Sequence, residues 1–134
     1  MQINVLIETR PGLFIDNRAR VTATLAEQVA RNRYVGQLST VSAPELGAMI
    51  DRILDYFNRW SQGDERGLKE CLDFLENMCF ALTTPLAEAA YALYVLRDGV
   101  AALLSAEAGS ENTETIGQVN RFFEMLVRNL LRRY

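Results

Sequence analysis

The stretch that decides the fold is Leu86–Leu104, LAEAAYALYVLRDGVAALL. Its apolar residues leave few polar positions, and the preceding Thr84-Pro85 supplies a helix cap followed by a first-turn proline. The pattern predicts a long helix that is apolar over most of its circumference, and we expect it to lie at the centre of the domain. Its three charged residues interrupt the apolar run, so we do not expect membrane insertion: Glu88, Arg97 and Asp98.

Three more helices are predicted before this stretch. Apolar residues recur at helical spacing over about residues 12–33, which predicts the first. Ser42 is a candidate cap for the second, because Glu45 follows at the capping-box spacing that satisfies two backbone donors. We expect this helix to end at the Ser61-Gln62-Gly63 turn.

The remaining segments continue the helical pattern. Asp64 is expected to cap a third helix, and a last one begins near Thr113 and shows no stop signal before Tyr134. We therefore predict an all-α bundle of about five to six helices, forming one domain over 1–134. The missing stop signal indicates that this helix continues past Tyr134 or makes a dimer contact, and we expect the chain to be the N-terminal part of a longer protein.

Composition excludes several kinds of function. The 134 residues are 49% hydrophobic and include no histidine, so His-ligated haem, the usual zinc sites and histidine-based nucleophiles have no candidates. A net charge of −3 argues against nucleic-acid binding. Cys71 and Cys79 stand about 12 Å apart on one helix, too far to bridge. We interpret them as reduced core residues of a cytoplasmic protein.

Two pairs of carboxylates are candidates for holding a metal ion or sharing a proton. Asp51 with Asp55, and Glu70 with Asp73, share helix faces but stand among basic residues. We interpret both pairs as solvated surface, and we expect no catalytic, metal or cofactor residues.

Aromatic residues are the most suggestive side chains. Trp60, Phe80, Tyr91 and Tyr94 fall on the second, third and fourth helices, where they could line a small apolar pocket. Buried tyrosines need a partner for the hydroxyl or an outlet to water. A packed aromatic core with the hydroxyls at its margin is the alternative, which the close packing of protein interiors favours.

The last helix carries a candidate dimer seam. Ile116, Phe123, Val127 and Leu130 recur at helical spacing, and an apolar seam at an unfinished helix favours a contact with a second copy. Phe122 and Phe123 are neighbours rotated by about 100°, so we expect one of them to face a partner.

The chain resembles the N-terminal sensor domains of RsbR-type stressosome proteins. The resemblance rests on three stretches: Tyr34–Leu46 leading into Ile50-x-x-Ile53-Leu54-x-x-Phe57, then Leu86–Val100, and the final Phe122-Phe123-x-x-Leu126-Val127-x-x-Leu130-Leu131-x-x-Tyr134. It implies a globin-like fold that binds no haem, homodimers formed through the terminal helices, and regulation of an attached output module in the stress response.

These observations together predict a non-enzymatic sensor or regulatory domain. It would form a homodimer and pass a signal through its C-terminal helix to an output domain or a partner signalling protein. The alternative is a carrier of a small apolar or tetrapyrrole-type ligand, held beside Tyr91 and Tyr94.

Overall fold

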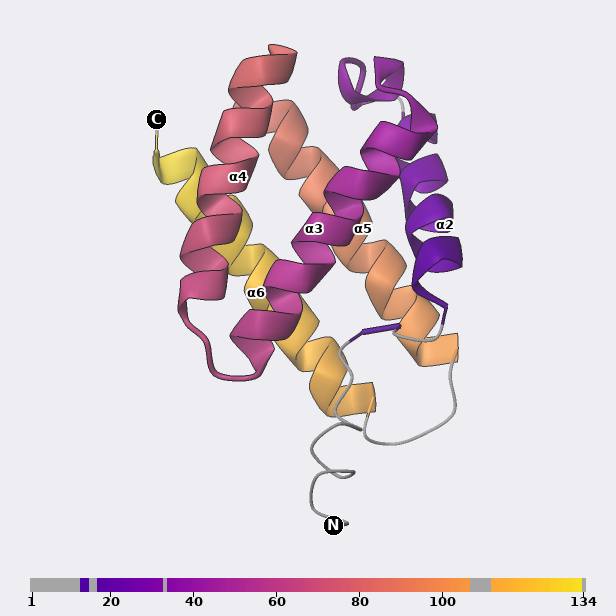
Figure 1. Ribbon diagram of the computed structural model, residues 1–134, viewed down its shortest axis with the longest axis vertical. Helices are drawn as coiled ribbons and strands as arrows, with labels where there is room; N and C mark the ends of the chain where they lie inside the picture. The colour runs from indigo at the N-terminus through magenta and orange to yellow at the C-terminus, as the bar shows by residue number, and fades with distance from the viewer. Residues whose placement is uncertain (1–12, 15–16, 33, 107–111, 134) are drawn as a thin grey trace.

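The described part of the chain folds into a bundle of helices (Figure 1). The computed structural model describes residues 13–14, 17–32, 34–106 and 112–133, and within these ranges it contains no strand. The elements are α2 (Arg18–Arg31), the short 3-10 helix η1 (Leu38–Thr40), α3 (Ala43–Ser61), α4 (Arg66–Leu82), α5 (Leu86–Ala106) and α6 (Asn112–Arg132). The prediction of an all-α bundle is confirmed.

Helix α6 contacts three other helices of the bundle. It packs against α5, α4 and α3, whereas α5 packs mainly against α6 and α2. As a result α6 buries a wide arc of side chains, and five of them have no exposed surface: Val119, Phe122, Phe123, Leu126 and Leu130.

The prediction that Phe122 or Phe123 faces a partner was wrong. Phe122 lies against Phe57 and Trp60 of α3, with ring centroids 5.4 and 5.2 Å apart, and the Phe123 ring meets Phe122 edge-on at 5.7 Å. Both phenylalanines are buried because helices contact α6 on more than one side. A single core stripe, which the sequence argument assumed, underestimates the buried arc of such a helix.

Helix α5 buries eight of its 21 residues, but one side of it is exposed, so it is not enclosed all round as its composition led us to expect. In the part of the chain that the structure describes, it is the one helix long and apolar enough to cross a membrane by length and composition, and 44% of that window lies inside the fold. Core helices of soluble proteins meet the same criterion. Its buried side packs on α6 and α2, and its other side is exposed.

The start of α3 follows its predicted cap with one difference. Ser42 Oγ accepts a hydrogen bond from the Glu45 backbone N–H at 3.3 Å. The Glu45 carboxylate accepts from the Ser42 hydroxyl at 3.2 Å. The hydroxyl therefore satisfies one backbone donor of α3, whereas the capping-box prediction had the Ser42–Glu45 pair satisfying two.

The end of α3 lies at the predicted glycine. Gly63 has φ +104°, and its N–H donates to the Trp60 carbonyl at 3.0 Å. The Asp64 N–H donates to the Arg59 carbonyl at 3.0 Å, which completes a Schellman motif. The Asp64 carboxylate then accepts from the Arg66 backbone N–H at 3.1 Å, so Asp64 caps the start of α4 as predicted.

The first described helix begins later than predicted. Instead of starting near residue 12, which lies outside the described residues, α2 begins at Arg18. Phe14 has a left-handed backbone with φ 55°, which cannot continue a right-handed helix. Leu13 and Phe14 are buried, and the Leu13 N–H donates to Asn58 Oδ1 of α3 at 3.0 Å. This tertiary contact accounts for the break.

Candidate functional site

The four aromatic residues predicted to line a pocket do not come together. Trp60 packs into the core against Phe122, and Phe80 is 89% exposed at the end of α4. Tyr91 and Tyr94 lie on the side of α5 that faces away from the core, with 41% and 39% of their surface exposed. The carrier hypothesis placed a ligand beside these two tyrosines, and their outward position gives it no enclosing wall.

Instead, the two tyrosines belong to an exposed surface that runs along α5. The residues at the exposed positions are spaced four, three, four and four apart, as one face of a helix requires. We call this surface the α5 tyrosine face, and it comprises Ala87, Tyr91, Tyr94, Asp98 and Ala102. Aspartate is its one charged member, so the surface is unusually apolar for an exposed helix side.

Neighbouring side chains order the α5 tyrosine face. Tyr34, which follows α2, lies against Tyr91 with ring centroids 5.0 Å apart. The Arg97 guanidinium lies 4.9 Å from the centre of the Tyr94 ring and pairs with Asp98 at 3.1 Å. These contacts restrict both tyrosines before any partner binds. The contact between Tyr34 and Tyr91 was not predicted, because the distance between them along the chain carries no periodic signal.

The predicted dimer seam on α6 is taken up by packing within the chain. Phe123 and Leu130 have no exposed surface, Val127 is 4% exposed, and Ile116 is partly buried against the core. These side chains are therefore not a free face of α6. Dimer formation stays a prediction, and it requires a different surface.

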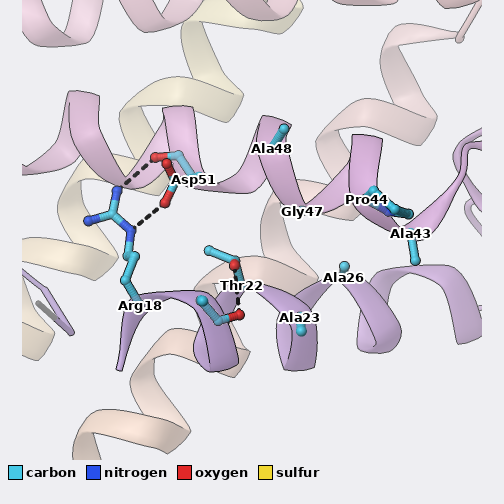
Figure 2. A pocket seen from close by; sticks show the side chains of 10 residues that line it. Arg18, Thr22, Ala23, Ala26, Ala43, Pro44, Gly47, Ala48 and Asp51 are labelled. Carbon is cyan, nitrogen blue, oxygen red and sulfur yellow. Dashed lines mark hydrogen bonds and ion pairs between the residues drawn. The ribbon is translucent and has the colours of Figure 1, made fainter. Parts of the chain in front are cut away.

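A groove of about 670 Å³ lies between α2 and α3 (Figure 2). Small residues line most of it, including Ala23, Ala26 and Gly47. At one end Arg18 pairs with Asp51, with Nε 2.7 Å from Oδ1 and Nη2 donating to the backbone carbonyl at 2.8 Å. The groove is open, and its guanidinium, that of Arg18, is already paired and so is not free to bind a ligand.

The carboxylate pairs are charged surface, as predicted. Arg18 Nη2 also binds Asp55 Oδ1 at 2.7 Å, so one arginine of α2 spans the Asp51–Asp55 pair. Glu70 pairs with Arg59 at 2.9 Å, and Asp73 with Lys69 at 3.2 Å. Among the described residues no group of three or more histidine, cysteine or acidic side chains is placed to hold a metal ion.

Both cysteines are buried, as expected of core residues. Cys71 has no exposed surface and Cys79 is 6% exposed. Burial raises the pKa of the Cys71 thiol far above its ordinary value. Burial, with Glu88 and Glu76 nearby, raises the pKa of Cys79 to about 11. Because the thiolate is the reactive form, neither cysteine has the character of a nucleophile near neutral pH.

Comparison of the chain with protein-family models, with curated proteins and with solved structures finds no match. The globin-like arrangement and the RsbR-type family therefore stay predictions from the resemblance.

Proposed function

We propose that this chain is a non-enzymatic regulatory domain that pairs with a second copy through the α5 tyrosine face. The observation that carries the proposal is an ordered, exposed tyrosine surface on the most apolar helix of the fold. Tyrosine and arginine are enriched in protein interfaces, since they supply a large contact area with a polar group at its edge. Charged residues dominate most exposed helix faces, but not this one.

The α5 tyrosine face is complementary to itself in shape. Its first half carries Tyr91 and Tyr94, and its second half carries Ala101, half-buried, and Ala102. An antiparallel pairing about a two-fold axis at the level of Leu96, the middle residue of α5, places Tyr91 of one copy opposite the alanines of the other. Large side chains then meet small ones twice, as an isologous interface requires.

The same pairing is complementary in polar groups. A two-fold axis at this level brings Tyr94 of one copy opposite Asp98 of the other, so the phenol can donate to the carboxylate. Asp98 is 72% exposed in its side chain, and its partner Arg97 lies on the same helix. No unpaired charge would be buried, which is the condition for a stable contact.

Coupling to an output would run through α6. Helices α5 and α6 form the most extensive contact in the fold. A change in how two α5 helices pack would therefore shift the position of α6. We propose that the C-terminal end of α6 passes this change to an output module or to a separate signalling partner. Two packings that differ by only a few kcal/mol are sufficient for such a switch.

Sedimentation equilibrium of the whole chain tests the pairing. Ala102→Glu places a charge opposite Tyr91 in the proposed interface, and we expect dimer affinity to fall by about 100-fold or more, which is roughly 2.7 kcal/mol. Ala30→Glu is the matched control, because Ala30 is also an exposed helix alanine but lies on α2. A wild-type chain that is monomeric at about 0.1 mM, or equal weakening by both variants, would overturn the proposal.

A further inference from the structure

A second pocket lies where the end of α4, the start of α5 and the end of α6 meet. Its volume is about 360 Å³, within the range of small-molecule sites. Leu86 and Leu130 form apolar walls, and Phe80 stands beside them with 89% of its surface exposed. Thr84 supplies a hydroxyl from the α4–α5 turn.

The turn itself holds Thr84 in the pocket wall. Thr83 ends α4 in the left-handed region, with φ 54° and ψ 40°, a conformation that a β-branched residue rarely adopts. The Thr84 N–H then donates to the Cys79 carbonyl at 2.9 Å. Thr84 is consequently turned inward and only 6% exposed.

The Thr84 hydroxyl has no hydrogen-bond partner in the described part of the chain. The contrast with Thr22, the other buried polar residue described, is informative: the Thr22 hydroxyl donates to the Ala19 carbonyl at 3.0 Å. A buried hydroxyl without a partner keeps its full desolvation cost. Thr84 Oγ1 is itself enclosed in this structure, but because Thr84 lines a pocket, a rotation of its side chain can bring the hydroxyl to a bound molecule.

The charges around the pocket select against anions. Arg133 is already held by two carboxylates, with Nη1 3.0 Å from Asp73 Oδ1 and 2.8 Å from Glu76 Oε1. Lys69 also pairs with Asp73, so these four groups balance, and the net negative charge near the pocket comes from Glu88 beside Cys79. The raised pKa of Cys79 agrees with this sign, since Glu88 and Glu76 add to the effect of burial.

We propose that this pocket binds a small amphipathic molecule, neutral or cationic, whose polar group hydrogen-bonds to Thr84 Oγ1. Its apolar part packs on Leu86 and Leu130, with Phe80 as a further aromatic contact. The inference is independent of pairing through the α5 tyrosine face, because Tyr91 and Tyr94 do not line the pocket.

Three probes of similar size and different charge test the proposal: 2-phenylethanol, 2-phenylethylamine and 3-phenylpropionate. Each is titrated into the ¹⁵N-labelled whole chain and followed by NMR at the amides of Cys79, Thr84 and Leu130. We expect saturable shifts from the alcohol and the amine, and at least tenfold weaker binding of the carboxylate. No saturable binding of any probe at about 10 mM, which would leave water alone as the occupant, overturns the proposal.

Variants separate the hydroxyl from the shape of the pocket. Thr84→Val keeps the shape and is expected to weaken the alcohol and the amine at least tenfold, while Thr84→Ser retains binding. Thr22→Val is the matched control, since it removes a buried threonine hydroxyl on α2 and leaves the pocket intact. Equal binding by wild type and Thr84→Val, or tighter binding of the carboxylate, contradicts the assignment.

Discussion

Helices α5 and α6 have the same length, 21 residues, and opposite relations between composition and burial. Helix α5 is the more apolar, yet Tyr91 and Tyr94 stand exposed along one side. Helix α6 is charged along one face, yet Phe122 and Phe123 are both fully buried. The more polar helix therefore buries its aromatic side chains, whereas the more apolar helix leaves its tyrosines exposed.

The difference shows that the placement of the neighbouring helices, and not the composition of a helix, decides which of its side chains are buried. Helix α6 packs against three helices, so a wide arc of its surface is removed from water. Helix α5 packs mainly against two, and apolar residues on its third side remain outside. An apolar side that the fold leaves exposed indicates a role outside the fold, such as association.

The largest expected effect is a cavity in α6. Phe122→Ala should lower the free energy of unfolding by about 3–5 kcal/mol, since it removes a ring enclosed by Phe57 and Trp60. Tyr94→Ala on α5 should change it by less than about 1 kcal/mol, because the side chain is exposed. Urea denaturation measures both. Similar losses at the two sites would contradict the comparison.

The glycine within α5 and the glycine within α6 should respond to replacement by alanine with opposite changes in stability. A Cβ on Gly99 of α5 would lie 2.7 Å from Leu25 Cδ2 and 2.5 Å from Gln28 Oε1 on α2, so Gly99→Ala should cost about 1–3 kcal/mol. Gly117 of α6 has nothing within 4 Å of that position. Gly117→Ala should therefore stabilise the helix by about 0.5–1 kcal/mol. Stabilisation by both substitutions in thermal melts would show that α5 and α2 are not closely packed.

A gain of similar size is expected at the turn that leads into α5. Thr83→Gly should stabilise the chain by about 0.5–1 kcal/mol, because glycine adopts the left-handed backbone at less cost than a β-branched residue. Gly63 already provides the equivalent conformation at the end of α3. Thr83→Ala, which retains a Cβ, is the control and should not reproduce the gain in a urea titration.

The smallest effect concerns the end of α6. Hydrogen bonding to Arg133 holds the pKa of Asp73 below its usual value, so the contact stabilises the fold above the unfolded-state pKa and is lost as the pH falls. Arg133→Met should lower the melting temperature slightly near pH 7, and the difference from wild type should vanish below about pH 3. Arg132→Met is the control. A difference in melting temperature that grows as the pH falls would contradict this prediction.

Local patterns were sufficient for several features of the fold. Ser42 and Gly63 mark the two ends of α3, since caps and left-handed turns depend on a few adjacent residues. Local patterns did not predict that α2 begins only after Phe14, where the chain contacts α3. They also did not predict that Phe122 and Phe123 are both buried. The stacking of Tyr34 on Tyr91 and the unpaired Thr84 hydroxyl lie between segments and have no periodic signature.

The sequence by itself determined the helical class, most helix ends and the lack of histidine chemistry, because these depend on composition and on spacings of three or four residues. Only the tertiary structure decided that Phe122 and Phe123 are both enclosed and which side of α5 faces water. Those outcomes depend on the number and position of neighbouring helices, which no single segment encodes. The candidate surfaces follow from that placement: the α5 tyrosine face outside, and Thr84 inside its pocket.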